Sequence, residues 1–234
     1  MSVEKPTAGH LVLLARTPKS QYILPVSTRL PLFPIQLVLF PNVQLPLHIF
    51  EERYRLLIKR SVKENSPFGV VYHRGGKIMR VGCSAVVSRV IGAYDDGRFD
   101  VIAIGRERFA IDAVDDSGAC LEADVHFLEE PVGDDDEALV DRAIALLVSY
   151  GRYAGIRLDR DVLSTLTASQ LSFLIAGIDV FGPDAKQELL ELEPAERRLE
   201  WALPRLARVN SRLASAHRLK KTLNRTVDID SFMN

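Results

Sequence analysis

Hydrophobic and polar residues alternate over short runs through the first half of the chain, which is the pattern of β-strands. The clearest alternation covers residues 121–127, where apolar residues are separated by Glu122, Asp124 and His126. One face of this strand is therefore expected to contact water. Between two earlier runs, the pair Asp96-Gly97 is typical of a hairpin turn. Strands are expected at residues 68–72, 81–91, 99–104, 108–113 and 121–127.

A proline-rich stretch and one helix are also predicted in the first half of the chain. The apolar stretch from Leu30 to Pro41 is interrupted by prolines, so its strands are expected to be short or to lie at an edge or a bend. A helical period then follows and ends before Pro67, and its apolar positions form one stripe that faces the core. These positions are Tyr54, Leu57, Ile58, Ser61 and Val62. Short strands with one early helix predict a compact, barrel-like β domain.

After Pro131 the hydrophobic positions follow the period of α-helices. The first helix is expected to have an aspartate as its N-cap, and two later helices to have proline at their first position. Pro204 is expected to bend or break the last helix. Helices are expected to begin in the acidic run 134–137, to cover residues 169–180, to begin at Pro183, and to run from about Pro194 to Leu223.

The chain is therefore expected to have an α+β fold, with a β domain followed by a helical domain. The stretch before the β domain mixes prolines with polar residues, as flexible segments do. The expected parts are a flexible N-terminal arm (1–25), the β domain (26–130), the helical domain (131–225) and a frayed tail (226–234).

Composition narrows the classes of function. Thirty basic and 31 acidic residues give the 234-residue chain a formal net charge of -1, which counts against strong attraction to nucleic acid or to anionic membranes. Two cysteines do not make a disulfide framework. No apolar run has the length of a membrane span, and Leu11–Ala15 is shorter than the core of a secretion signal. A cytoplasmic protein without membrane contact is expected.

No catalytic residue, cofactor or metal site is predicted. The five histidines are scattered, and Cys83, Cys120 and His126 lack the Cys-x-x-Cys pair that anchors a zinc site. Gly76-Lys77 is followed by Ile78, so the hydroxyl that a phosphate-binding loop needs is missing. No Gly-x-Ser-x-Gly elbow is present for a serine nucleophile.

Several motifs, in order along the chain, resemble the amino-terminal domain of the Lon protease family. Two departures are mild: Glu52 stands where the family often has proline, and Cys83 where it often has threonine. The resemblance covers roughly residues 28–225, and its β half is the more specific. The motifs are Leu30-Pro31-Leu32-Phe33-Pro34, Val38-Leu39-Phe40-Pro41, Leu45-Pro46-Leu47-His48-Ile49-Phe50-Glu51-Glu52-Arg53-Tyr54, Phe68-Gly69-Val70-Val71, Val81-Gly82-Cys83, Asp96-Gly97-Arg98, Gly105-x-x-Arg108-Phe109, Lys186-Gln187-Glu188-Leu189-Leu190-Glu191 and Glu196-Arg197-Arg198-Leu199.

The resemblance implies a PUA-like β pseudo-barrel followed by a helical bundle, the part of Lon that engages protein substrates. The family's ATPase and serine–lysine peptidase modules do not fit in this length, so no enzymatic activity is expected. The expected role is to bind unfolded or partly folded polypeptide, as an adaptor or regulator of proteolysis, with a protease or chaperone as a further partner. Most residues of the apolar N-terminal region should be core, and the others are expected to line a peptide-binding groove. The candidates are Phe33, Phe40, Leu45, Leu47, Ile49 and Phe50.

Charge is unevenly placed within the near-neutral total. Residues 129–141 carry seven acidic and no basic side chains, whereas residues 204–225 carry seven basic and no acidic ones. A solvated helix face explains the basic run. The alternative is a contact with an acidic partner or with nucleic acid, since PUA-like barrels also occur in RNA-binding proteins, although the net charge counts against it. The candidate contact residues are Arg212, Arg218, Lys220 and Lys221.

Overall fold

The computed structural model describes residues 27–131, 133 and 136–226. The predicted arm (1–25) and residues 227–234 of the predicted tail lie outside these residues. The strands are β1 (Thr28–Ile35), β2 (Gln44–Ile49), β3 (Phe68–Arg74), β4 (Lys77–Ile78), β5 (Val81–Ala93), β6 (Phe99–Asp115) and β7 (Glu122–Phe127). The helices are α1 (Glu52–Glu64), α2 (Glu137–Ala154), α3 (Arg160–Leu163), α4 (Ala168–Gly177), α5 (Pro183–Glu191) and α6 (Ala195–Thr226).

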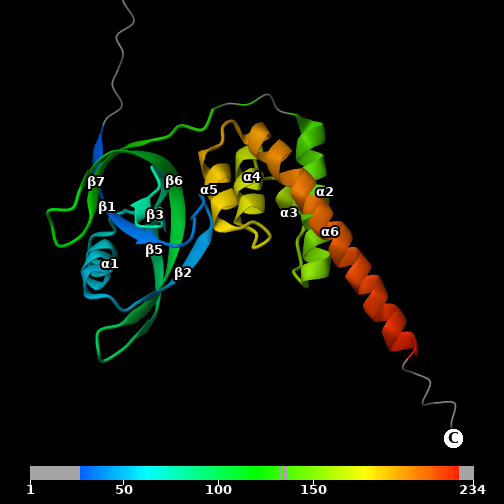
Figure 1. Cartoon of the computed structure of the whole chain (residues 1–234), viewed down its shortest axis with the longest axis horizontal. Helices are drawn as coiled ribbons and strands as arrows, with labels where there is room; N and C mark the ends of the chain where they lie inside the picture. The colour runs from blue at the N-terminus through cyan, green and yellow to red at the C-terminus, as the bar shows by residue number, and fades with distance from the viewer. Residues whose placement is uncertain (1–26, 132, 134–135, 227–234) are drawn as a thin grey trace, which may run out of the picture.

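Five strands close into a barrel in the order β1-β7-β6-β5-β3, because β1 pairs with β7 on one side and, in parallel, with β3 on the other. Closure leaves no open edge between these strands. β4 extends the sheet from β3, and β2 pairs with the first half of β6. Figure 1 shows this β lobe beside the helical lobe, with α6 projecting away from both.

The two strands expected at 99–104 and 108–113 form one continuous strand, β6, of 17 residues. On one edge, β6 pairs with β5 along both halves. On the other edge, β6 pairs with β2 before Gly105 and with β7 after it. The sequence pattern breaks at Gly105 because the neighbouring strand changes there, and the strand itself does not end.

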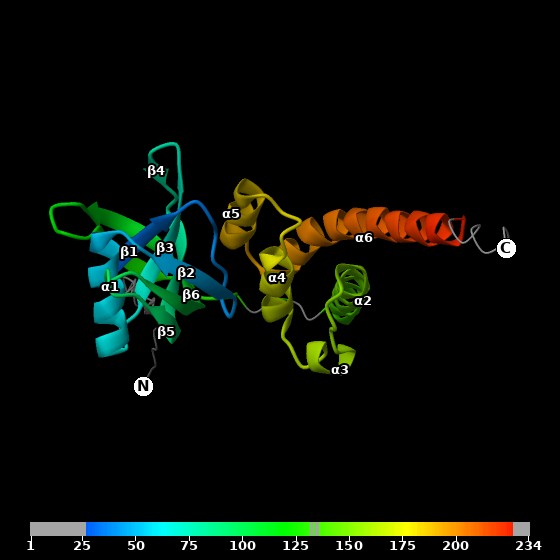
Figure 2. The same ribbon diagram turned by 90° about the horizontal axis from the view of Figure 1, so that it is seen from below.

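α1 lies on the side of the β lobe that faces away from the helical lobe (Figure 2). Leu57, Ile58 and Ser61 are buried, and the Tyr54 ring lies 4.5 Å from that of Phe33 between centroids. Val62, expected in the same stripe, is 46% exposed. The helix ends at Asn65, which takes the left-handed conformation that favours a C-cap.

The helical lobe begins as the local signals indicate. Asp136 is the N-cap of α2 and accepts a hydrogen bond from the Leu139 N–H, and Pro183 opens α5. α6 continues through Pro204 without a break. Pro204 lies on the exposed side of the helix, while Leu203 and Leu206 on either side of it are fully buried, so packing holds both segments in one helix. The single-turn helix α3 was not expected.

The two lobes share a hydrophobic cluster at their junction, beside two clusters that lie within the β lobe alone. Val38, Phe40 and Tyr72 of the β lobe belong to the cluster formed by α2, α4, α5 and α6. The Phe40 ring lies 6.0 Å from that of Phe173 between centroids. Gln187 on α5 also donates a hydrogen bond of 3.0 Å from Nε2 to the Val81 carbonyl. The predicted boundary near residue 131 lies between β7 and α2.

Two buried arginines complete the junction between the lobes. Arg108 on β6 donates to the carboxylates of Glu130 and Glu193, at 3.0 and 2.7 Å. Arg198 on α6 donates to the Glu130 carboxylate, to the Ser172 hydroxyl at 2.9 Å and to the Leu192 carbonyl at 2.8 Å. Burial lowers the pKa of Arg198, but arginine titrates so far above neutrality that it stays charged.

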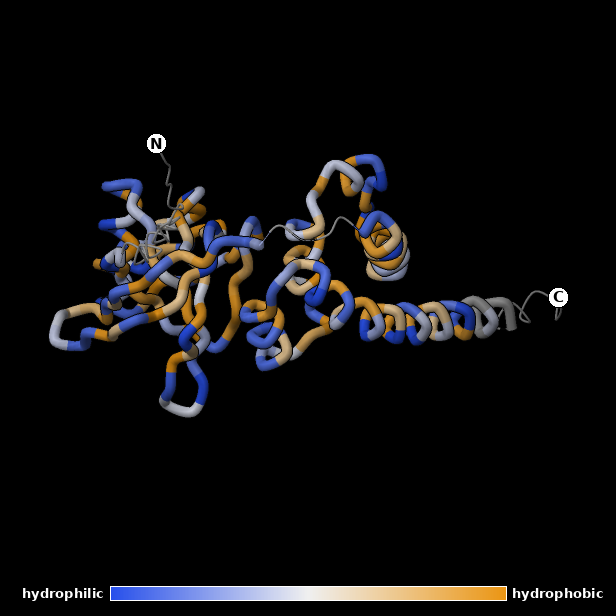
Figure 3. The backbone as a smooth tube through the Cα atoms, turned by 90° about the horizontal axis from the view of Figure 1, so that it is seen from above, coloured by the Kyte–Doolittle hydropathy of each residue, from blue (hydrophilic) through white to orange (hydrophobic). Residues whose placement is uncertain are grey.

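Hydrophobic and hydrophilic residues alternate along the chain in the β lobe and along α6 (Figure 3). Within residues 27–131, 133 and 136–226, no helix combines the length and apolar character that crossing a membrane requires.

Candidate peptide-binding groove

Five of the six residues predicted to bind peptide belong mainly to the core. Leu45, Leu47 and Ile49 occupy alternate positions of β2 and face the barrel interior, leaving between 1% and 8% of each exposed. Phe33 and Phe40 are likewise buried, at 5% and 1%. These five side chains therefore do not line an open groove, because β2 turns its apolar side inward and Phe33 and Phe40 are packed in the core clusters.

Phe50 is the exception, with 59% of its surface exposed. Its ring stacks on that of His48, 6.0 Å away between centroids. His48 Nδ1 lies 2.6 Å from Asp100, whose carboxylate also accepts a hydrogen bond of 2.7 Å from the Tyr94 hydroxyl. These contacts hold Phe50 and Tyr94 together on the surface beside the β5–β6 hairpin.

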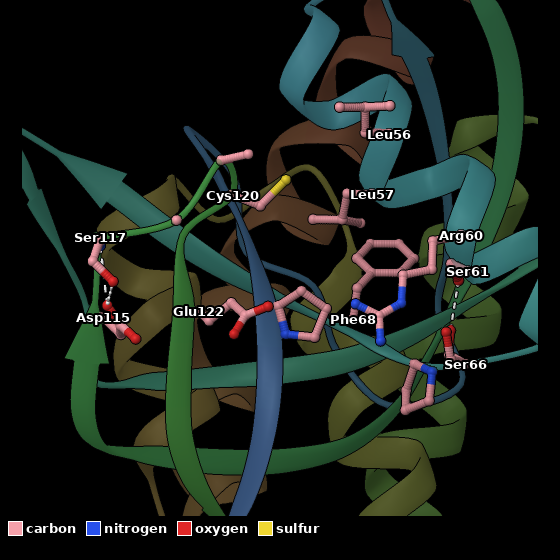
Figure 4. Close-up of a pocket in the computed structure, with 14 residues that line it drawn as sticks. Leu56, Leu57, Arg60, Ser61, Ser66, Phe68, Asp115, Ser117, Cys120 and Glu122 are labelled. Atoms are coloured by element: carbon pink, nitrogen blue, oxygen red, sulfur yellow. Dashed lines mark hydrogen bonds between the residues drawn. The ribbon is translucent and has the colours of Figure 1, made fainter.

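A groove lies elsewhere on the same lobe, between α1 and the turn that joins β6 to β7. Its volume is about 430 Å³. Figure 4 shows Phe68 in its centre, Leu56 and Leu57 entering from α1, and Cys120 and Ser117 on the opposite side. Apolar carbon forms its floor, with Leu56 at the rim 56% exposed. The apolar lining residues are Pro31, Leu56, Leu57, Pro67, Phe68 and Ala119.

Local structure places each wall of the groove. α1 ends at Asn65, and the chain returns through Ser66 and Pro67 to β3, where Phe68 is fully buried beneath the opening. On the far wall, the Asp115 carboxylate accepts hydrogen bonds from the N–H and hydroxyl of Ser117, at 3.0 and 2.6 Å. This local turn fixes the β6–β7 connection opposite α1.

The rim of the groove is charged. Arg29 on β1 contacts the carboxylates of Asp115, of Glu122 at 2.9 Å and of Asp124 at 3.5 Å. The hydrogen bonds from Ser117, and then the one from Arg29, lower the pKa of Asp115 to about 2. The Asp115 carboxylate therefore stays ionised near neutral pH. On α1, Arg60 pairs with Glu64 at 3.1 Å.

The two cysteines differ in their exposure to solvent. Cys120 lines the groove, is partly exposed, and donates a hydrogen bond of 3.2 Å from Sγ to the Arg53 carbonyl. Cys83 is fully buried in the barrel, and burial raises its pKa to about 12. The thiolate is the reactive form, so Cys120 is the thiol open to reagents in solution.

The groove has the lining of a binding site. Its apolar lining suits apolar side chains, and the charged residues Arg60, Asp115 and Glu122 also line it. Among the residues that the structure describes, no three His, Cys, Asp or Glu side chains gather in a way that would hold a metal ion.

Sequence reasoning missed this groove because its walls come from β1, α1 and the β6–β7 turn. One signal was present. Leu56 is an apolar residue of α1 that lies outside the predicted core stripe, but single apolar residues are common on protein surfaces, so this signal does not locate a groove by itself.

The predicted basic contact residues lie on the projecting part of α6, where Arg212, Arg218 and Lys220 are exposed. Successive helical residues are about 100° apart, so Arg218 and Lys220 lie about 160° apart around the helix axis. They do not form one face. The side chain of Lys221 lies outside the described part of the chain.

Comparisons with known proteins identify relatives of this fold. A family model for the "ATP-dependent protease La (LON) substrate-binding domain" matches residues 29–208. Lon protease from Paraburkholderia phytofirmans is 29% identical over 184 residues, which are 73% of this chain and 23% of that protein. Lon protease 2 from Syntrophobacter fumaroxidans is 24% identical over 216 residues, 86% of this chain and 27% of that protein. The chain thus spans about a quarter of the length of these curated relatives.

Two solved structures share the fold. A Lon N-terminal domain protein from Xanthomonas campestris superposes with a TM-score of 0.60 at 24% identity, covering 76% of this chain and 98% of that one. The N-terminal domain of Lon protease from the Mycobacterium avium complex gives a TM-score of 0.64 at 20% identity, with coverage of 77% and 98%. The predicted α+β class, a PUA-like pseudo-barrel followed by a helical bundle, is confirmed.

Proposed function

The chain belongs to the LON substrate-binding domain family, and we propose from this premise that it binds unfolded or partly folded polypeptide in the groove between α1 and the β6–β7 turn. The observation that carries the proposal is the apolar lining of this groove, in which Leu56, Pro67 and Ala119 are exposed to solvent. Unfolded chains expose apolar side chains that folded proteins bury, so an apolar groove selects them without demanding a particular sequence.

The role that we propose is non-catalytic. The relatives carry the name Lon protease, and a protein that holds an unfolded segment in a groove can present it to a protease or a chaperone. We therefore propose that the chain acts as an adaptor or regulator of proteolysis. The charged rim around the apolar floor limits the exposed apolar area when the groove is empty.

The direct test is a titration of a fluorescently labelled, permanently unfolded protein, followed by anisotropy. Saturable binding is expected, with competition by peptides rich in leucine and phenylalanine but not by polar peptides of equal length. Flat titration curves for the unfolded protein and for the apolar peptides would reject the proposal.

Leu56→Ser is expected to weaken this binding about three- to tenfold, because complete burial of a leucine side chain contributes about 1.5–3 kcal/mol and a client would cover Leu56 in part. The matched control is Leu219→Ser on α6, where the leucine is 62% exposed and far along the projecting helix. Both changes introduce the same residue at an exposed helical position. Equal effects of the two variants would contradict the assignment of the groove.

A further inference from the structure

We propose that the chain's own N-terminal arm occupies this groove, with Leu11–Ala15 in the place of a client segment. The proposal deepens the proposed function, because it makes the arm a competitor that regulates access. The contact between arm and groove can nevertheless be measured without any client.

The connection between arm and barrel brings the two together. The arm joins β1, where Thr28 pairs with Val125 of β7, and three residues later Pro31 forms part of the groove wall. At about 3.3 Å per residue, this separation is about 10 Å along the strand. The twelve residues between Ala15 and Thr28 span up to about 40 Å when extended. The segment therefore reaches the groove with length to spare for a reversal.

The chemistry of the segment matches the groove floor. Residues 11–15 read Leu-Val-Leu-Leu-Ala, five consecutive apolar residues between His10 and Arg16. An apolar run of this length has no polar face to present to water, so contact with the exposed Leu56, Pro67 and Ala119 of the groove would remove it from solvent.

Charge complements this fit. Residues 1–26 contain Lys5, Arg16 and Lys19 but only one acidic residue, Glu4. The wall formed by the β6–β7 turn and β7 carries an excess of carboxylates over its one close arginine, Arg29. Basic residues that flank the apolar segment would therefore meet an acidic rim. The carboxylates that contact Arg29 are Asp115, Glu122 and Asp124, and the first two line the groove.

Attachment makes even a weak contact effective. A segment on a short linker has an effective concentration of about 1 mM at its site. If the free segment bound with a dissociation constant of about 0.1 mM, the groove would be occupied about ten to one, and removing the segment would raise the affinity for a client about tenfold.

The test uses Cys120 as a reporter within the groove. The rate at which a disulfide reagent such as 5,5′-dithiobis(2-nitrobenzoate) labels the native protein is followed by absorbance. Replacing Leu11 and Leu13 by serine in the full chain is expected to raise the rate about five- to tenfold. The matched control replaces Val3 and Ile23, two apolar residues outside the segment, and should leave the rate unchanged. Cys120→Ser identifies the signal, because Cys83 is buried.

An unchanged rate in the Leu11→Ser, Leu13→Ser variant would overturn the proposal. A rate for the unaltered chain that falls as protein concentration rises would assign the groove to the arm of a second copy, and would also overturn it. Faster labelling without any client binding would support the arm contact and reject the proposed function. Client binding with an unchanged labelling rate would support the proposed function and reject the contact between arm and groove.

Discussion

Replacing Arg198 by alanine is expected to lower the free energy of unfolding by about 3 kcal/mol, the low end of the range of about 3–5 kcal/mol for breaking a buried ion pair. The Arg198 side chain is fully buried and joins α6 to Glu130, to Ser172 on α4 and to the Leu192 carbonyl. Its guanidinium also lies over the Phe173 ring, 4.1 Å from the centroid. The alanine variant removes this donor from the Ser172 hydroxyl and the Leu192 carbonyl and opens a cavity.

The low end of the range applies because the Glu130 side chain keeps 28% exposure, so water can hydrate it, and because Arg108 still contacts it at 3.0 Å. Urea unfolding followed by circular dichroism measures the effect. Arg197→Ala is the matched control, since Arg197 is the exposed neighbour of Arg198 on the same helix, and it should change stability by less than about 0.5 kcal/mol. Equal losses for the two variants would show that the buried network contributes no more than a surface arginine.

Gly105→Ala is expected to lower the free energy of unfolding by about 3 kcal/mol. In a chain of this size, the loss lowers the melting temperature by about 6–12 °C. A Cβ atom at Gly105 would lie 2.1 Å from the Phe40 carbonyl oxygen and 3.2 Å from Cys83 Sγ. The obstacle is backbone, which cannot rotate away as a side chain can. Gly105 also exchanges hydrogen bonds with the loop before β2, donating to the Val43 carbonyl and accepting from the Asn42 N–H.

Differential scanning calorimetry of Gly105→Ala beside Gly182→Ala isolates this steric effect. No atom lies within 4 Å of a Cβ at Gly182, whose φ of −69° suits any residue. Gly182→Ala should therefore remain within about 0.5 kcal/mol of the unaltered chain. A melting temperature for Gly105→Ala within 2 °C of the unaltered protein, well short of the expected shift of about 6–12 °C, would show that the loop yields to the extra methyl group.

The motif Gly105-x-x-Arg108-Phe109 shows how far the sequence could lead. This motif indicated the family, and in the structure each of its three named residues makes a specific tertiary contact. Gly105 allows the close approach of Phe40, and Arg108 holds Glu130 and Glu193 at the junction. The Phe109 ring fills the space above Gly69 and Gly82, where an added Cβ would lie 2.8 and 2.6 Å from it. Motifs of this kind record tertiary contacts, so they identify the fold reliably.

Local patterns placed most elements because strands, caps and turns depend on near neighbours. The position of the groove depends on distant ones. Leu45, Leu47 and Ile49 are as apolar as Leu56, and only the pairing of β2 with β6 decides that the first three face the core. Arg197 and Arg198 are equally charged neighbours, and no local signal indicates which one α6 turns towards Ser172.

The core shared by the lobes has a consequence for any attempt to divide the chain. Val38, Phe40 and Tyr72 are covered by the helices, so a fragment ending at residue 131 would leave three large apolar side chains bare. The helical half alone would in turn lack the aromatic ring that packs on Phe173. The boundary that is visible in the sequence therefore separates two kinds of secondary structure that bury hydrophobic surface against each other.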